Sequence, residues 1–404
     1  VSYVMAATPK SAHGETTAFA GLASRDVHVI GAAFCEGQNL AGADAAPAAL
    51  RAAGLAPALA KLGWTVHDPG DLDFDARYRE RGLGASLPLD KHHESMERYR
   101  EWEDSGMAVN FATWAHDHGA QHGSGADGDA AVGESSARAP PQIVNGPLIG
   151  CGLELVHEAV ARAAALGRFA LTLGGDHSVA AGSVSALCEA YPRLGVIWID
   201  AHADANTPST SPSLHYHGMP AAHLLGWFER QPAGFDWLRP GVLPESSLAY
   251  IGLRDIDPDE AKLLRASKAH VYTMRDVDKH GIGRVVEMAL EAVDPHRNGP
   301  LHLSLDVDAV DPHFAPGTGT MVRGGLTYRE IHYIAEEMAL TGRLVGMDLV
   351  EVNPHLEPSQ AGGGAARAMH NEDPEAAHVS PTVNLGVELI LSALGKTIMH
   401  DRYH

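Results

Sequence analysis

Short runs of β-branched and apolar residues alternate along this chain with longer segments rich in Ala and Leu. Turn residues bound the short runs, and the alternation is typical of a parallel sheet with crossover helices. The sequence therefore predicts an α/β fold. The expected strands are 27–34, 63–67, 169–173, 195–200, 247–253, 269–273, 301–306 and 344–350. The expected helices are 45–62, 153–166, 179–191, 328–341 and 382–394.

Two segments interrupt this alternation. The first, at about 77–141, is rich in histidine and contains a run of Gly, Ala, Ser and Asp at 119–138, and the second is 360–378. Long loops inside a compact domain are usually functional, disordered or inserted, and we expect the first to be a solvated, partly helical insertion rather than a metal site. The segment 1–25 is rich in Ala, Ser and Thr, lacks an apolar secretory core and is expected to be flexible.

The charge balance excludes several classes of partner. The 404 residues include 30 Lys and Arg against 51 Asp and Glu, a formal net charge of −21. Such a surface disfavours nucleic acid and anionic membranes, whereas a cationic small-molecule substrate is compatible with it. No apolar stretch reaches the roughly 18 to 20 residues of a membrane span. Three scattered cysteines suit a reducing compartment, which is the cytoplasm, or an organelle if the first residues are the remnant of a transit peptide.

Acidic and histidine side chains follow three of the predicted strands. His177 comes after the glycine pair Gly174-Gly175, which allows a sharp turn. Asp200, His202 and Asp204 follow the run 196–199, and Asp306 and Asp308 follow the run 301–305. With a period of two in an extended chain, the side chains of each motif would project on one side, at the edge of the sheet where ligands bind.

Four carboxylates at one sheet edge would repel each other strongly unless cations compensated them, and two divalent ions match their charge. Ligation by oxygen with one imidazole per ion and no thiolate favours Mn²⁺ over Zn²⁺. Two such ions at roughly 3.5 to 4 Å could acidify one water and so produce hydroxide at neutral pH. The motifs therefore predict a dinuclear hydrolytic centre.

These residues resemble the arginase family of ureohydrolases. The resemblance also rests on 34–42 (FCEGQNLAG), 68–72 (DPGDL), 206–208 (NTP), 217–218 (HG), 250–257 (YIGLRDID), 317–320 (GTGT), 324–330 (GGLTYRE) and 351–354 (EVNP). It covers the chain from residue 26 to 394 apart from the two insertions. It implies a three-layer αβα sandwich around an eight-stranded parallel sheet, and a single catalytic domain at 26–404.

The resemblance also implies the ligands and the reaction. One manganese ion would be held by His177, Asp200, Asp204 and Asp306, and the other by Asp200, His202, Asp306 and Asp308. Hydroxide held between the ions would attack the guanidinium carbon of L-arginine, and collapse of the intermediate would give L-ornithine and urea. Asp308 would hydrogen-bond the nucleophile, His217 would shuttle protons and Glu351 would orient the guanidinium.

The expected substrate-binding residues distinguish arginine from agmatine, which lacks the α-carboxylate. Asn206, Ser211 and Ser213 resemble the carboxylate-binding positions, Asp257 with Glu260 resembles the ammonium-binding pair, and Thr320 completes the set. Departures from the family pattern occur at Ala309, Pro212, His215, Tyr216 and Met321, and the run 315–320 is partly agmatinase-like.

An agmatinase or another guanidino-compound hydrolase is therefore the alternative within the class, and a catalytically silent regulatory homologue is the alternative outside it. The resemblance further implies a homo-oligomer, a trimer or a hexamer.

Overall fold

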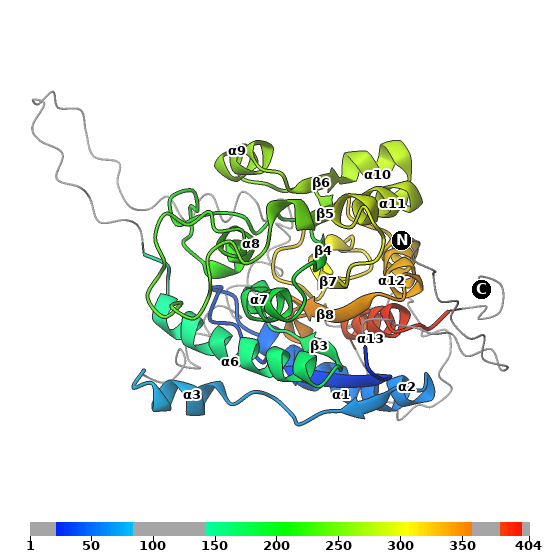
Figure 1. Ribbon diagram of the computed structural model, residues 1–404, viewed down its shortest axis with the longest axis horizontal. Coiled ribbons are helices and arrows are strands. Elements are labelled where there is room, and N and C mark those ends of the chain that lie inside the picture. The colour runs from blue at the N-terminus through cyan, green and yellow to red at the C-terminus, as the bar shows by residue number, and fades with distance from the viewer. Residues whose placement is uncertain (1–21, 84–141, 358–379, 398–404) are drawn as a thin grey trace, which may run out of the picture.

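A computed structural model of the chain describes residues 22–83, 142–357 and 380–397. Eight strands form one sheet in the order β2-β1-β3-β8-β7-β4-β5-β6, and every neighbouring pair is parallel (Figure 1). The strands are β1 Asp26–Gly31, β2 Thr65–His67, β3 Phe169–Leu173, β4 Gly195–Ile199, β5 Leu248–Leu253, β6 His270–Thr273, β7 Leu301–Asp306 and β8 Leu344–Val350. The predicted eight-stranded parallel sheet is confirmed.

Helices cover both faces of the sheet and complete the three layers (Figure 1). On one side lie α3 Phe74–Glu80, α6 Gly146–Ala165, α7 Ala180–Ala190 and α8 Pro220–Leu224. On the other lie α1 Ala46–Ala52, α2 Leu55–Lys61, α10 Met274–His280, α11 Ile282–Val293, α12 Tyr328–Leu340 and α13 Pro381–Ala393. A short helix, α9 Pro258–Ala266, follows β5.

The sheet separates two apolar cores because successive side chains of a strand point to opposite faces. In β4, Ile197 and Ile199 pack into the core under α11, α12 and α13, whereas Val196 and Trp198 pack into the core under α6 and α7. Such strands are buried on both faces, which is why they read as continuous apolar runs in the sequence.

Two predicted helices differ from the structure. The expected helix 45–62 is two helices, because Gly54 adopts a left-handed conformation (φ +87°) between α1 and α2. The expected helix 153–166 begins earlier, at Gly146. Its first turns carry glycines that suggest a loop, but the glycines serve close packing, since a Cβ on Gly150 would lie 2.4 Å from the carbonyl oxygen of Gly234.

Parts of the predicted insertions can be located. Residues 77–83 belong to the packed fold, because α3 runs to Glu80 and Tyr78 is fully buried. The remainder of the first insertion, the whole of 360–378 and residues 1–21 lie outside the described residues. Within the described ranges, no helix is both long and apolar enough to cross a membrane.

Candidate metal centre

The predicted ligand motifs follow strands that are adjacent in the middle of the sheet. His177 follows β3, and Asp200 to Asp204 follow β4. Asp306 is the last residue of β7 and Asp308 comes shortly after it, while Glu351 follows β8. These four strands stand side by side in the order β3-β8-β7-β4. Their carboxyl ends therefore bring residues from four parts of the sequence to one place.

A glycine turn sets the position of His177. A Cβ on Gly175 would lie 1.7 Å from the carbonyl oxygen of Phe34, so the chain can pass there only as glycine. Asp176 then accepts a hydrogen bond from the Ser178 amide and begins the short helical turn His177–Val179. This turn leaves the His177 ring buried, with 1% of its surface exposed.

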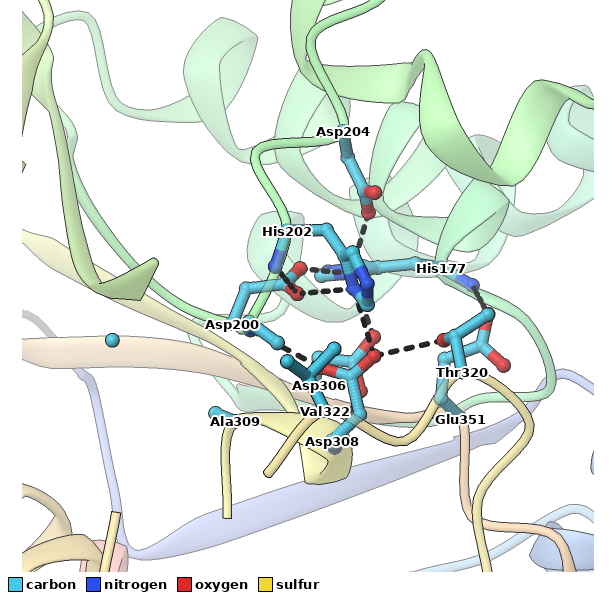
Figure 2. A network of polar contacts seen from close by, with 12 residues as sticks. His177, Asp200, His202, Asp204, Asp306, Asp308, Ala309, Thr320, Val322 and Glu351 are labelled. Atoms are coloured by element: carbon cyan, nitrogen blue, oxygen red, sulfur yellow. Dashed lines mark hydrogen bonds and ion pairs between the residues drawn. The ribbon is translucent and has the colours of Figure 1, made fainter. Parts of the chain in front are cut away.

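The Asp200 and Asp306 motifs are not extended as the period-two pattern predicts. Asp200 Oδ1 accepts a hydrogen bond from the His202 amide, and Asp306 Oδ1 accepts one from the Asp308 amide, each at 2.7 Å. These side chain–backbone bonds turn the chain as each strand ends. Asp204 also has a left-handed backbone (φ +50°). The polar side chains nevertheless point to a common centre (Figure 2).

Two imidazole nitrogens stand among the carboxylates. His177 Nδ1 lies 2.9 Å from Asp204 Oδ2, 3.1 Å from Asp200 Oδ2 and 3.3 Å from Asp306 Oδ2. His202 Nδ1 lies 3.0 Å from Asp308 Oδ2 and 3.5 Å from Asp200 Oδ1. Among the described residues, two groups are compact enough for a metal ion: His177 with Asp200 and Asp204, and Asp200 with His202 and Asp308. Asp200 belongs to both groups.

The carboxylates of the cluster disfavour one another's ionisation. Burial and the charges of Asp308 and Asp200 raise the pKa of Asp306, and burial with the charge of Asp200 raises that of Asp204 to about 6. Burial opposes ionisation of Asp200, but the adjacent His177 and His202 outweigh it and lower its pKa. His177 Nδ1 is buried and has no hydrogen-bond partner, although it faces three carboxylates. Cations fit this donor set and would resolve the repulsion.

The predicted catalytic residues lie beside this cluster. Glu351 has a left-handed backbone (φ +60°), and its Oε1 accepts a hydrogen bond from the His177 amide at 3.0 Å. His217 Nδ1 lies 3.5 Å from the same oxygen. Burial disfavours a charged His217, but Glu351 outweighs burial and raises its pKa. Thr320 donates a hydrogen bond to Asp308 Oδ2 at 2.9 Å (Figure 2).

Gln38 is a site residue to which sequence reasoning assigned no role. Its side-chain amide donates a hydrogen bond to Glu351 Oε2 at 3.1 Å, across 313 residues of sequence. Gln38 lies in the segment 34–42, one of the segments that carry the family resemblance. Nothing else in the sequence pointed to Gln38 as a site residue. Together with the His177 amide, it holds both oxygens of Glu351.

The predicted substrate-binding residues of the loops after β4 and β5 stand in three arrangements. Asn206 Nδ2 donates to Asp257 Oδ2 at 2.9 Å, so these two stand together. Glu260 accepts hydrogen bonds from the amides of Ala205 and Asp257 and caps α9, and burial raises its pKa to about 8. Both oxygens of the Glu260 carboxyl group therefore accept hydrogen bonds from backbone amides. Ser211 and Ser213 accept hydrogen bonds from the amides of Leu214 and His215 within their own loop.

The parallel sheet and the cluster of histidines and aspartates at its carboxyl edge define an α/β protein with a buried cluster suited to bind metal. A family model described as "Arginase family" matches residues 25–392. The chain belongs to the arginase family.

Individual proteins named arginase are similar to this chain over most of its length. The chain is 36% identical to an arginase of Eremothecium gossypii over 97% of its own length and 81% of that protein. It is also 36% identical to human mitochondrial arginase-2, covering 92% of this chain and 85% of that one. The crystal structure of Bacillus subtilis arginase superimposes with a TM-score of 0.66 at 29% identity, covering 93% of this chain and all of that one.

Proposed function

We propose that this protein is a manganese-dependent arginase that hydrolyses L-arginine to L-ornithine and urea. The observation that carries the proposal is the convergence of two imidazoles and four carboxylates from the ends of β3, β4 and β7 in a member of the arginase family. The donor set is rich in oxygen and has no thiolate, which favours Mn²⁺.

His177, Asp200, Asp204 and Asp306 would hold one ion, and Asp200, His202, Asp306 and Asp308 the other. Two manganese ions, when bound by these residues, would supply hydroxide at neutral pH as the nucleophile for the guanidinium carbon. The protein's own groups must place that carbon and move the protons.

Glu351 is suited to orient the guanidinium. A carboxylate pairs with this planar cation through two parallel hydrogen bonds. Gln38 and the His177 amide fix the plane of the Glu351 carboxylate before substrate arrives. His217, with a raised pKa and Glu351 beside it, is suited to give a proton to the leaving amine. Asp308, held by Thr320, is suited to hydrogen-bond the nucleophile.

The far end of the substrate would meet the loops after β4 and β5. Asn206, Ser211 and Ser213 offer neutral hydrogen-bond donors for an α-carboxylate, and Asp257 offers a carboxylate for the α-ammonium. Because Glu260 is engaged by two backbone amides, we assign it to holding Asp257 at the start of α9. A site for an α-carboxylate has no use in agmatine hydrolysis, and this favours arginine.

Urea release from L-arginine and from agmatine, with and without added Mn²⁺, tests the proposal. We expect Mn²⁺-dependent turnover of arginine, abolished in Asp306→Ala together with bound metal. Equal turnover of agmatine would overturn the assignment of arginine. Metal-loaded protein that releases urea from neither compound would favour the silent regulatory homologue.

The oligomeric state is predicted from the family resemblance, and the cellular compartment is predicted from the cysteine content. We propose a trimer or a hexamer, which light scattering on the purified protein would distinguish from a monomer. The three cysteines of the sequence are free and buried, in keeping with the reducing compartment proposed, cytoplasm or organelle.

A further inference from the structure

The loop 34–38, which follows β1, contacts two of the residues that would act on the substrate. The Gln38 side chain donates a hydrogen bond to Glu351 Oε2 at 3.1 Å. The Gly37 carbonyl oxygen accepts a hydrogen bond from the His217 amide at 3.1 Å. The position of this loop therefore affects both the proposed guanidinium-binding carboxylate and the proposed proton shuttle.

Glu36 ties loop 34–38 to two helices. Its side chain is buried, and Oε1 accepts a hydrogen bond from the Tyr78 hydroxyl of α3 at 3.2 Å. Its Oε2 accepts a hydrogen bond from the Cys35 amide at 3.0 Å. The Asn145 side chain, just before α6, donates to the Glu36 carbonyl oxygen at 3.3 Å. Neither Glu36 nor Tyr78 has a role in the function proposed above.

Tyr78 offers Glu36 a fixed support. The Tyr78 side chain is fully buried beneath α6, in the core that α3 shares with that helix. Ion pairs also fasten α3 to α6, with Arg77 2.6 Å from Glu158 and 3.5 Å from Glu154. A hydroxyl held by this packed helix pair can keep the Glu36 carboxyl group in one place.

The contact between Glu36 and Tyr78 requires hydrogen bonding rather than charge. Burial raises the pKa of Glu36, although the hydrogen bonds from Cys35 and Tyr78 oppose this effect. A neutral glutamine could keep both contacts. Its amide can accept from the Cys35 N–H and donate to the Tyr78 hydroxyl, since a hydroxyl also accepts hydrogen bonds.

We propose that Glu36 and Tyr78 are positioning residues that act through loop 34–38 on the reacting end of the substrate. The loop has a further anchor, because the Gly37 amide donates a hydrogen bond to Asp176 Oδ2 at 2.8 Å. Loss of the Tyr78 hydroxyl should therefore loosen the loop without releasing it. This inference rests on the proposed function.

Steady-state urea release from L-arginine by the full-length, Mn²⁺-loaded protein tests the inference. Tyr78→Phe removes only the hydroxyl and should lower kcat about tenfold, because small displacements of groups that place the substrate are costly. KM should stay within about twofold, since other residues would bind the amino-acid end of the substrate. Glu36→Leu should show the same loss, and Glu36→Gln should restore kcat.

Two measurements besides activity accompany these assays. Elemental analysis should find wild-type metal content in Tyr78→Phe, because no proposed metal ligand contacts its hydroxyl. Amide hydrogen exchange in a peptide that covers loop 34–38 should be faster in Tyr78→Phe than in wild type, because a loosened loop opens more often.

A double-mutant cycle separates positioning from a general loss of stability. If Tyr78 acts through Gln38, Tyr78→Phe should lower kcat about threefold or less in a Gln38→Leu background. Tyr333→Phe is the matched control. Tyr333 lies on α12, across the sheet from α3, and its hydroxyl also bonds a glutamate, Glu337. Its loss should leave kcat unchanged.

An unchanged kcat in Tyr78→Phe, or equal losses in both backgrounds of the cycle, would overturn the inference. Loss of metal in Tyr78→Phe, or a lower kcat in Tyr333→Phe, would also overturn it. If Glu36→Leu does not fold, as judged by circular dichroism, Tyr78→Phe and Glu36→Gln decide. A wild-type protein that releases no urea from arginine with Mn²⁺ would instead contradict the proposed function itself.

Discussion

The side-chain amide of Asn206 donates a hydrogen bond to Asp257, with 2.9 Å between Nδ2 and Oδ2. The two residues come from the loops after β4 and β5, which are neighbouring strands. Asn206 is the proposed partner of the substrate α-carboxylate, and Asp257 is the proposed partner of the α-ammonium. The bond therefore places both recognition groups for the amino-acid end side by side.

Asn206→Ala should raise KM for L-arginine about tenfold or more, because it removes a donor to the carboxylate and a partner of Asp257, while bound metal stays unchanged. Steady-state urea assays check this. Asn298→Ala is the control, since Asn298 is exposed and accepts a hydrogen bond from Arg193 far from the site. An unchanged KM in Asn206→Ala would remove Asn206 from the substrate site.

Gln38→Leu should lower kcat/KM for arginine about 10- to 100-fold, since a hydrogen bond to a charged group contributes roughly 1.5 to 3 kcal/mol. The substitution frees Oε2 of Glu351 without altering any proposed metal ligand. Metal content should therefore remain two ions per chain. A loss of metal in Gln38→Leu would show that Gln38 supports the cluster rather than the guanidinium-binding carboxylate.

Gly175→Ala should lower the free energy of unfolding by about 3 kcal/mol or more, because overpacking against backbone cannot be relieved by a side-chain shift. Gly146→Ala is the comparison. A Cβ there would meet only Ile143, at an ordinary 3.6 Å, and its effect should stay within about 1 kcal/mol. Thermal unfolding of both metal-free variants measures the difference. Similar stabilities would contradict the close approach to Phe34.

His223 should make stability depend on pH below neutrality. It is fully buried, with Nδ1 2.7 Å from the Tyr216 hydroxyl and Nε2 3.2 Å from Gln231 Oε1. Burial lowers its pKa to about 4, against about 6.5 in the unfolded chain. Between these values the unfolded chain binds the extra proton, so the contribution of neutral His223 to stability decreases as pH falls from about 6.5 towards 4.

The difference in unfolding free energy between wild type and His223→Gln should therefore shrink by about 2 kcal/mol between pH 7.5 and pH 5. Denaturant unfolding at both pH values measures it. His313→Gln removes an exposed histidine and should show no such change. A pH-independent difference for His223→Gln would mean that the ring titrates as it does in water.

Strand positions were predictable because a strand buried on both faces is largely apolar throughout, as β4 and β5 are. Helices were harder to place. Helix α9 begins with a capping box formed by Asp257 and Glu260, a recognisable sequence signal, but these acids were interpreted only as substrate ligands. The predicted helix 153–166 missed the first residues of α6, where Gly150 packs against Gly234, a residue remote in sequence.

By itself, the sequence determined which residue types end which strands, and so which side chains could meet at the carboxyl edge of the sheet. It determined the chemistry of the cluster, since four carboxylates with two imidazoles require cations. Only the tertiary structure decided the order of the strands, which sets β3, β8, β7 and β4 side by side. It also decided which neighbours orient the ligands, such as Gln38 for Glu351 and Ser304 for His177. Those contacts join residues more than 100 positions apart, and their geometry depends on strand register and packing, which no local pattern encodes.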